Sequence, residues 1–574
     1  MVFSRLTPGL LLPRQESAVS GGVVLRPAPV ILLGAAWMAT VCNLPLWRAL
    51  HETGLLRGAA GVGLAMALSL ALFGVLSALL SLLAWRWTLK PALTLLLVLA
   101  AGGAYFMETY HIVIDPTMWT NVLQTDAREA SALIGLRWAA WMIVLAGLPL
   151  AFLWRGRITY AAPHWQAVRN ACGIACGLAL AAAAVLAAFQ PLASAMRNHK
   201  ELRYLINPLN TLYAAGSQAA VGARRKANSP PLPVGQDAYL AAAGTRPALL
   251  LLVLGETARA DHFSLNGYAR PTNPELARED VVSWRNAWSC GTNTAASVPC
   301  MFSHLGRDRF GAANVASENL LDVLQHAGLA VLWVDNQAGC KGVCDRVPHG
   351  TTEAKAAPDL CRDGECQDEA LLRGLDARIQ ALPPERRAHG VVVVLHQMGS
   401  HGPAYSQRSP SAYKRFLPEC TSINLQDCSA DELRNAYDNS LLYTDHVLAS
   451  AIHWLKAREA SHDTALLYVA DHGESLGENN LYLHGLPYSI APDVQKHVPW
   501  VTWLSASFQH DQGINAPCLR ERAVAPVSHD NLFHSVLGLM SVRTGVYAPA
   551  LDAYAGCRTA PGGIDGPLAR MAAH

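Results

Sequence analysis

Carboxylate and imidazole side chains stand just behind two short apolar runs of this chain. Glu256 follows the run 248–254, and Asp471 and His472 follow the run 464–470. Taken singly, an Asp at a strand end is usually a helix cap and a lone His is usually structural. Together they are ligand types that suit zinc, so we predict that they converge on one metal site.

Further histidines repeat this arrangement elsewhere in the chain. His396 and then His401 follow the apolar run 391–395, and His484 comes shortly after the acidic segment that follows residue 470. If these runs are neighbouring strands, the imidazoles extend the predicted site.

The segment 289–301 (SCGTNTAASVPCM) supplies hydroxyl groups for a transfer reaction. A Gly-containing turn that opens a helix offers backbone N–H groups and a positive dipole to a phosphate oxygen. A hydroxyl bound to zinc has a lowered pKa and attacks as an alkoxide. Thr292, Thr294 and Ser297 are all candidates, and their chemistry alone does not rank them.

These residues need elements that bring them to one edge. Helical patterns around 317–327 and 430–458 alternate with the apolar runs, which are short and nearly free of charge. The four runs are 248–254, 329–335, 391–395 and 464–470. Such alternation predicts an α/β domain with a largely parallel sheet, whose ligands lie beyond the carboxyl ends of the strands.

Cysteine usage indicates the compartment. Of 13 cysteines, Cys42, Cys172 and Cys176 lie in apolar segments and are expected to be small buried hydrophobes. The other ten are Cys290, Cys300, Cys340, Cys344, Cys361, Cys366, Cys420, Cys428, Cys518 and Cys557. We expect them to pair with their neighbours (290–300, 340–344, 361–366, 420–428, 518–557). Zinc knuckles are the alternative, but no two couples have paired CxxC spacing. Disulfides place this domain in an oxidising space outside the cytoplasm.

The N-terminal third is too apolar for a soluble protein. The 574 residues are 51% hydrophobic and only 15% charged, against about 25% charged in soluble domains. Five stretches are long enough to span a bilayer, at 29–47, 59–84, 91–107, 138–154 and 170–190. The net charge of +2 gives no reason to expect a nucleic-acid partner.

The distribution of basic residues predicts how the chain is oriented in the membrane. With the N-terminus inside, the inner segments carry eight basic residues and the outer loops four, in line with the positive-inside rule. Five spans then place everything after about 195 outside, in agreement with the cysteines. The predicted parts are a cytoplasmic N-terminus 1–28, a membrane domain 29–195 with an outer loop 108–137, a connector 196–235 and a catalytic domain 236–574.

In the outer loop, Asn121, Thr125 and Glu129 are spaced four apart, so they would share one face of a helix. From periodicity alone, this segment is a solvated amphipathic helix on the membrane surface.

Five segments together resemble the phosphoethanolamine transferases that modify lipid A, a group that includes the mobile colistin-resistance enzymes. They are VLGETARADHFSLNGY (253–268), SCGTNTAASVPCM (289–301), DNQAGCKGVCDRV (335–347), HQMGSHGPAY (396–405) and ADHGESLGE (470–478). This group lies within the alkaline phosphatase and sulfatase superfamily, so the resemblance implies five spans and a periplasmic α/β domain with that fold.

The resemblance also assigns roles to residues. It implies that Thr294, the second Thr of the CGTxT pattern, is the nucleophile. The implied zinc ligands are Glu256, Thr294, Asp471 and His472; the implied phosphoryl or substrate contacts are Lys341, His401 and His484. Asn121, Thr125 and Glu129 match a substrate-contacting motif, which replaces the surface-helix interpretation. Gln337 stands where some relatives carry Asn, so polar substrate contacts in this loop stay open.

The implied reaction has two steps. Thr294 takes phosphoethanolamine from phosphatidylethanolamine and then passes it to a lipid A phosphate, with zinc as cofactor and room for a second zinc ion. The implied enzyme is a monomer in the bacterial inner membrane, with its catalytic domain in the periplasm. Its product would give resistance to polymyxin and other cationic peptides, because the modified phosphate carries less net negative charge.

Other classes of function remain as alternatives. The same chemistry could serve a core sugar such as Kdo or heptose, a glycan, or water, which would make the protein a phosphodiesterase. A membrane-anchored binding module would have a degenerate site, and Glu256, Thr294, Asp471 and His472 are all intact. A transporter would have polar or broken helices in the bilayer, and the sequence gives no clear case.

Overall fold

Five long apolar helical stretches precede the soluble part of the chain. The structure is a computed structural model that describes residues 24–125, 130, 133–224, 230–241, 246–313, 315–362 and 364–558. The membrane-spanning stretches are Pro27–Glu52, Gly58–Leu82, Leu89–Tyr110, Leu136–Arg155 and Pro163–Ala187. The number of predicted spans is therefore confirmed. The fifth begins at Pro163 instead of near residue 170, so Arg169 lies within its helix.

The first and fourth spans are each interrupted, the first by a 3-10 turn at Val41–Asn43. The helices of this part are α1 (Pro27–Thr40), α2 (Leu44–Glu52), α3 (Gly58–Leu82), α4 (Leu89–Tyr110), α5 (Pro116–Gln124), α7 (Leu136–Met142), α8 (Leu148–Arg155), α9 (Pro163–Ala187), α10 (Phe189–Asn198) and α11 (Leu209–Arg224). A π-helical turn, Ile143–Gly147, separates α7 from α8.

Helices α3 and α9 approach each other closely through small residues. A Cβ atom added to Gly74 would lie 2.5 Å from the Gly177 carbonyl oxygen, so only glycine permits this contact. Cys42 is buried as predicted, but Cys172 and Cys176 on α9 are exposed. The prediction for these two was wrong because an apolar residue of a membrane helix faces lipid as readily as protein.

The chain forms two compact units. The first comprises Met1–Cys42, Gly54–Ala101 and Trp141–Ala193. The second comprises Asn43–Thr53, Gly102–Ala140 and Ser194–His574. The outer loop therefore belongs to the same unit as the C-terminal α/β domain.

That domain is built on an eight-stranded sheet in the order β15-β5-β14-β11-β4-β10-β6-β7. The strands are β15 (Val527–Ser528), β5 (Val281–Trp288), β14 (His497–Leu504), β11 (Asp463–Ala470), β4 (Ala248–Gly255), β10 (Gly390–His396), β6 (Ala330–Asp335) and β7 (His349–Thr351). Strand β14 runs antiparallel to both of its neighbours, and the other pairings are parallel. The predicted mostly parallel sheet is confirmed.

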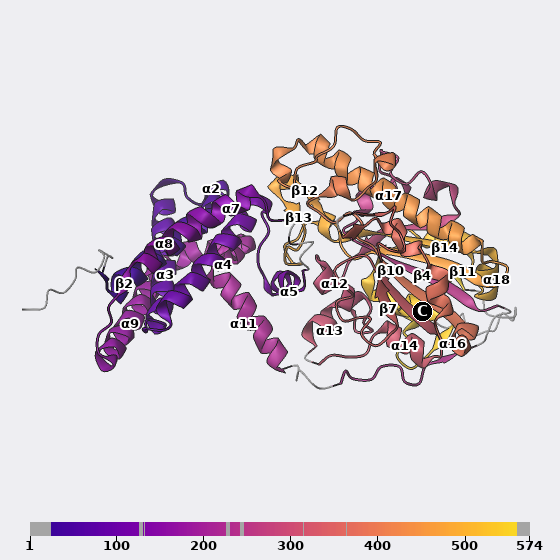
Figure 1. The fold of residues 1–574 in the computed structure, drawn as a ribbon, viewed down its shortest axis with the longest axis horizontal. Coiled ribbons are helices and arrows are strands. Elements are labelled where there is room, and N and C mark those ends of the chain that lie inside the picture. The colour runs from indigo at the N-terminus through magenta and orange to yellow at the C-terminus, as the bar shows by residue number, and fades with distance from the viewer. Residues whose placement is uncertain are drawn as a thin grey trace, which may run out of the picture. The chain divides into compact units, whose positions relative to one another are not determined.

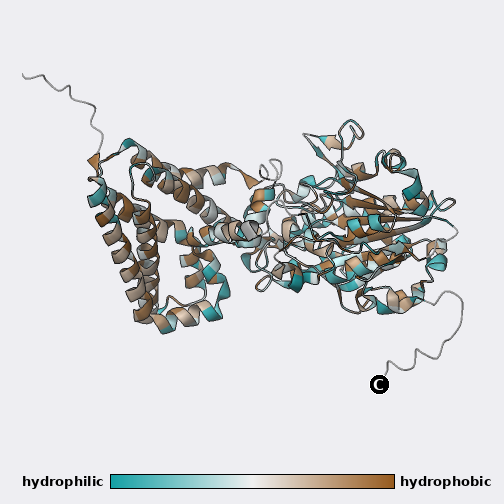
Figure 2. Cartoon of the chain, turned by 90° about the horizontal axis from the view of Figure 1, so that it is seen from below, coloured by the Kyte–Doolittle hydropathy of each residue, from teal (hydrophilic) through white to brown (hydrophobic). Residues whose placement is uncertain are grey.

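Helices cover the sheet on both faces, with α17 on one side and α14 and α16 on the other (Figure 1). The helices of this domain are α12 (Thr294–Met301), α13 (Gly306–Ala312), α14 (Leu320–His326), α15 (Leu375–Gln380), α16 (Pro384–His389), α17 (Ala430–Lys456), α18 (Ala506–Asp511), α19 (Ala516–Arg522) and α20 (Leu532–Leu539). Hydrophobic residues concentrate in the central strands, while polar residues lie on the outer helices and loops (Figure 2). Two-residue strands form four small pairs: β1 (Val24–Leu25) with β2 (Arg157–Ile158), β3 (Tyr239–Leu240) with β16 (Val542–Arg543), β8 (Cys361–Arg362) with β9 (Glu365–Cys366), and β12 (Ser475–Leu476) with β13 (Tyr482–Leu483).

Five disulfides join the ten cysteines of this domain. They are Cys290–Cys300, Cys340–Cys344, Cys361–Cys366, Cys420–Cys428 and Cys518–Cys557, the neighbour pairing preferred above. Two of them hold segments of the candidate site, since Cys290–Cys300 spans the Thr294 segment and Cys340–Cys344 brackets Lys341.

Candidate metal centre and active site

Glu256, Asp471 and His472 form one buried cluster. Glu256 follows β4 and the other two follow β11, and these strands are parallel neighbours in the sheet. One ligand atom from each residue lies within 4.8 Å of the others. All three side chains are at most 1% exposed, so the cluster is closed off from bulk water.

Asp471 is oriented as a cation ligand. Its Oδ1 accepts hydrogen bonds from the backbone N–H groups of Thr257 (3.2 Å) and His472 (2.8 Å). Its Oδ2 is buried and has no hydrogen-bond donor among the described residues. A buried carboxylate oxygen without a donor is costly unless a cation binds it, so this donor set fits a metal ion.

The orientation of His472 has the same implication. Its Nδ1 lies 2.9 Å from the Gly473 carbonyl oxygen, which accepts only when Nδ1 carries a proton. Nε2 then faces Glu256 Oε1 at 3.2 Å and Asp471 Oδ2 at 3.4 Å. Metal-binding imidazoles are commonly fixed in this way, with one nitrogen donating to a carbonyl and the other free to ligate.

The three pKa values describe the cluster without a cation. Burial acts to raise the pKa of Glu256, but the hydrogen bond and charge of His472 hold it well below its usual value. Burial and the Glu256 charge raise the pKa of Asp471 to about 7. Burial acts to lower the pKa of His472, but Asp471 and Glu256 raise it to about 10. The imidazolium supplies the positive charge that a metal ion would replace.

Thr294 places a hydroxyl against this cluster. It is the first residue of α12, whose N-cap Asn293 accepts from the Ala296 N–H at 2.9 Å. Thr294 Oγ1 lies 3.1 and 3.2 Å from the two carboxylate oxygens of Glu256 and 3.4 Å from His472 Nε2. The N-terminus of α12 therefore presents both a hydroxyl and a positive dipole at the cluster.

The other two candidate hydroxyls bond to the backbone. Thr292 Oγ1 donates to the Leu486 carbonyl at 2.6 Å, and Ser297 Oγ donates to the Asp471 carbonyl at 2.5 Å. Geometry thus ranks the three hydroxyls that chemistry alone did not, in favour of Thr294.

His401 and His484 lie together beside the cluster. Their ring centroids are 5.6 Å apart, and the ring of His484 is 4.2 Å from that of His472. Glu474, which is fully buried, lies 3.3 Å from His484 Nδ1 and orients that ring. Burial, reinforced by the charge of His472, lowers the pKa of His484.

The loop after β6 contributes two residues. Gln337 Nε2 donates to Glu256 Oε2 at 3.2 Å, so this residue contacts the cluster; the substrate contacts of its loop stay a prediction. Lys341 Nζ donates to the carbonyl of Ala338 at 3.0 Å and to that of Gln124 at 3.5 Å. The second contact joins this loop to the end of α5.

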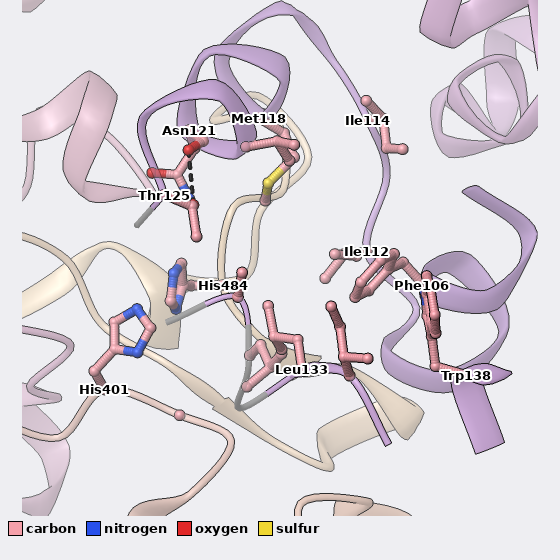
Figure 3. Close-up of a pocket in the computed structure, with 15 residues that line it drawn as sticks. Phe106, Ile112, Ile114, Met118, Asn121, Thr125, Leu133, Trp138, His401 and His484 are labelled. Carbon is pink, nitrogen blue, oxygen red and sulfur yellow. Dashed lines mark hydrogen bonds between the residues drawn. The ribbon is translucent and has the colours of Figure 1, made fainter. Parts of the chain in front are cut away.

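The outer loop lies opposite His401 and His484 at the site. Asn121 lies in α5, but the helix ends at Gln124 and Thr125 is extended, so the two do not share a helical face as expected. The Thr125 hydroxyl instead folds back onto the Asn121 carbonyl at 2.8 Å, and both residues face His401 and His484 (Figure 3). Glu129 lies outside the described residues.

A cavity of about 290 Å³ opens between this loop and the histidines. Most of its lining is apolar (Figure 3). The lining comprises Phe106, Ile112, Ile114, Met118, Asn121, Val122, Thr125, Ala130, Leu133, Ile134, Trp138, His401, Gly402, Leu483 and His484. The polar, charged cluster therefore lies beside an apolar cavity, an arrangement that suits an amphiphilic substrate.

His529 was not among the residues predicted from the sequence. Its imidazole forms hydrogen bonds to two separate segments of the site. Its Nε2 donates to the Ala470 carbonyl at 2.9 Å, and its Nδ1 accepts from the Cys290 N–H at 3.0 Å. Burial lowers its pKa to about 3, so it stays neutral and can both donate and accept. Its only sequence signal is a lone His in a polar segment. His396, by contrast, pairs with Asp335 at 3.1 Å instead of joining the cluster.

Comparison with known proteins places these features in context. Residues 248–542 match the sulfatase family, and residues 72–221 match a family described as phosphoethanolamine transferase EptA/EptB. The chain is 39% identical to phosphoethanolamine transferase EptA of Escherichia coli K12 over 92% of this chain and 96% of that one. It is 38% identical to phosphatidylethanolamine transferase Mcr-1 of E. coli, over 83% and 90%.

A solved structure covers both parts of the chain. The integral membrane lipooligosaccharide phosphoethanolamine transferase A of Neisseria meningitidis superposes with a TM-score of 0.87 and 33% identity. The match covers 93% of this chain and 99% of that one.

Proposed function

Because this chain belongs to the EptA/EptB family of phosphoethanolamine transferases, we propose that it transfers phosphoethanolamine from phosphatidylethanolamine to a lipid A phosphate. The reaction passes through phosphoethanolamine esterified to Thr294 and depends on zinc. The observation that carries the proposal is the Thr294 hydroxyl, held at the start of α12 against Glu256 and His472.

Glu256, Thr294, Asp471 and His472 would hold the zinc ion. The buried Asp471 Oδ2 without a donor and the orientation of His472 Nε2 support this assignment. When bound, zinc supplies a Lewis acid that lowers the pKa of the attacking hydroxyl and offsets charge on the phosphoryl oxygens.

In the first step, Thr294 Oγ1 attacks the phosphorus of phosphatidylethanolamine. A bond forms between Oγ1 and phosphorus, and the bond from phosphorus to the glycerol oxygen breaks. The diacylglycerol oxygen leaves with the electron pair and takes up a proton, while Thr294 Oγ1 loses its own proton, which it regains from the acceptor phosphate in the second step. Glu256 accepts the Thr294 hydrogen bond and orients the hydroxyl for this attack.

His401 and His484 are the candidate groups that carry the Thr294 proton to the leaving oxygen; His484 starts neutral, because its pKa is lowered, and takes up that proton before donating it. Both border the cavity on the side facing Asn121 and Thr125 (Figure 3). Lys341, from the loop after β6, would offset negative charge on the phosphoryl group. Asn121, Thr125 and Glu129 are the proposed substrate contacts from the outer loop, and their match to the family motif favours lipid A as the acceptor.

In the second step, a lipid A phosphate oxygen attacks the same phosphorus. Its new bond replaces the bond to Thr294 Oγ1, and the enzyme is regenerated. The apolar cavity beside the histidines supports a lipid donor, and five membrane spans keep the site at a lipid surface.

The setting is the periplasmic face of the inner membrane, where both lipids are accessible and disulfides form. The modified phosphate carries an ammonium group, so the surface attracts cationic peptides such as polymyxin less strongly.

The test is mass spectrometry of lipid A from a Gram-negative host that lacks its own transferases. We expect a phosphoethanolamine mass increase with the wild-type chain and none with Thr294→Ala, because the nucleophile is gone. Thr292→Ala is the matched control, since its hydroxyl donates to Leu486 and should not carry the transfer.

Other outcomes discriminate the alternatives. A mass increase on the core oligosaccharide alone would replace the acceptor, and free phosphoethanolamine without a modified lipid would indicate a phosphodiesterase. Full transfer by the Thr294→Ala chain would refute the nucleophile. Rescue of chelated enzyme by magnesium but not by zinc would contradict the ligand set.

A further inference from the structure

The first unit contains a second cavity, of about 600 Å³, remote in sequence from the site described above. It lies where α1 begins, α3 ends and α9 begins. Its lining comprises Arg26, Pro27, Ala28, Pro29, Ile31, Leu32, Phe73, Ser77, Ser81, Gln166, Arg169, Asn170, Gly173, Cys176, Gly177 and Leu180. All of these residues belong to the first unit.

The polar lining of this cavity favours an anion. Arg26 and Arg169 contribute guanidinium groups, and no carboxylate occurs among its lining residues. The described residues of the whole first unit likewise contain no Asp or Glu, so neither arginine has an acidic partner within that unit. Among the described residues of this unit, no carboxylate balances the two guanidinium charges.

One hydroxyl in the cavity lacks a partner. Ser77 is 5% exposed, and its Oγ is buried with no hydrogen-bond partner among the described residues. The neighbouring amides are already engaged: Gln166 donates to the Ala84 carbonyl and to Asn170, and Asn170 donates to the Ala84 carbonyl. These bonds engage the amides on this side of the cavity, whereas the Ser77 hydroxyl has no partner among the described residues.

The first turn of α1 adds to this polarity. The helix begins at Pro27 without a side-chain cap and without an acidic residue in its first turn. Pro27 and Pro29 have no backbone N–H, so this end of the helix contributes mainly its positive dipole, at the rim of the cavity beside Arg26.

Apolar side chains line the rest of the cavity. Ile31, Leu32, Phe73 and Leu180 contribute hydrocarbon surface.

Ser77 lies five residues before the end of α3 at Leu82, about 7.5 Å along the helix axis. This depth corresponds to the boundary between lipid head groups and acyl chains, so one ligand could reach both kinds of surface.

We propose that this cavity binds an anionic phospholipid of the cytoplasmic leaflet. Its phosphate would lie between Arg26, Arg169 and the Ser77 hydroxyl, with an acyl chain along the apolar wall. Because five spans separate the N-terminus from the periplasmic domain, the end at which α1 begins faces the cytoplasm. Arginine clusters on that side recognise acidic head groups.

A phosphate could also come from solution, but the apolar wall favours a ligand with a tail. The site would serve to anchor the helix bundle and takes no part in the transfer reaction. Its occupancy is therefore testable independently of catalysis.

The full chain, purified in detergent, is titrated with dioleoylphosphatidylglycerol, and bound lipid is counted by native mass spectrometry. We expect one tightly held lipid in the wild-type protein. Arg26→Gln and Arg169→Gln should each weaken binding about tenfold, as for the loss of a charge-assisted hydrogen bond. Ser77→Ala should weaken it about fivefold, as for a neutral hydrogen bond.

Arg155→Gln is the matched control, because Arg155 is an exposed arginine at the same end of the unit that does not line the cavity. It should leave binding within about twofold of wild type, since a distant surface charge contributes little. Equal weakening by Arg155→Gln and Arg169→Gln would overturn the proposal in favour of general surface attraction.

Competitors distinguish the sources of the ligand. Dioleoylglycerol, which lacks a phosphate, and dioleoylphosphatidylcholine, which is zwitterionic, should displace the lipid poorly. Equal displacement by dioleoylglycerol would show that only the acyl chain is held. Displacement by millimolar inorganic phosphate would assign the cavity to a soluble anion. Either result would overturn the phospholipid assignment.

Discussion

Asp471 and His472 carry protons that a metal ion must displace. Because their pKa values are raised to about 7 and about 10, both residues are protonated below pH 7 in the metal-free protein. Metal affinity should therefore rise with pH, by about 100-fold per unit below pH 7 and about tenfold per unit between pH 7 and 10. Zinc titration of the full chain by calorimetry in buffers from pH 6 to 8 checks this. An affinity independent of pH would contradict the ligand assignment.

A second prediction at the residue scale concerns how His529 positions the Thr294 segment. It bridges the Cys290 N–H and the Ala470 carbonyl, so it sets the position of the Thr294 segment relative to the end of β11. We expect His529→Leu to lower kcat about 100-fold with little change in KM, because a displaced nucleophile loses alignment before it loses binding.

His529→Gln is the discriminating variant. Its amide can both donate to Ala470 and accept from Cys290, so kcat should recover to within about tenfold of wild type. If both variants lower the melting temperature equally and kcat follows stability alone, His529 is structural and the positioning role is wrong.

At the scale of elements, the disulfide Cys290–Cys300 encloses the turn that opens α12. Replacing both cysteines with Ala should lower the unfolding free energy by about 2–4 kcal/mol, as for other native disulfides, and should also reduce transfer. Replacing Cys361 and Cys366, which join β8 (Cys361–Arg362) to β9 (Glu365–Cys366), is the control.

We expect replacement of Cys361 and Cys366 to lower the unfolding free energy without a comparable loss of kcat, because this disulfide bridges a hairpin outside the metal cluster. Denaturant unfolding and lipid transfer measured on both double variants check this. A similar loss of kcat in both would show that the first disulfide has no special part in positioning Thr294.

The elements that sequence could predict are those with uninterrupted apolar runs. The four predicted strands correspond to β4, β6, β10 and β11, and α14 and α17 fall within the predicted helical stretches. Strands β5 and β14 were not predicted. Strand β14 contains Pro499, and its pairing with β5 shifts register between Val498 and Trp500, because proline cannot donate to the ladder.

The residues of the metal cluster could be predicted because each stands at a strand end, and strand ends of a parallel sheet meet at one edge. The family and enzyme class predicted from the five motifs are confirmed by the relatives. The contacts made by Glu474 and Gln337, and any role for His529, could not be found in this way. Each acts through a contact between segments far apart in the chain, and no local pattern marks such a contact.

At the scale of the whole molecule, the apolar cavity connects the outer loop to the catalytic domain. Ile134 lines it and is 50% exposed, so Ile134→Gln should fold normally. We expect KM for a long-chain donor to rise about tenfold, because burying an amide beside an acyl chain costs about 1–3 kcal/mol. A water-soluble short-chain donor should be used as well as by the wild type.

Leu136→Gln is the control for this variant, since Leu136 is 93% exposed and does not line the cavity. Transfer assays in mixed micelles with donors of graded chain length check both variants. A similar change in KM for both donors, or in both variants, would remove the cavity from donor binding.

The catalytic unit is assembled from three stretches of chain, Asn43–Thr53, Gly102–Ala140 and Ser194–His574, with membrane spans between them. During synthesis, the first two stretches emerge from the ribosome and cross the membrane before the sheet exists. The outer-loop segment that carries Asn121 and Thr125 therefore reaches the periplasm before the strand-end cluster of the active site has formed. A fragment begun after the last span would retain the strand-end cluster and Thr294, but it would lack that outer-loop segment altogether.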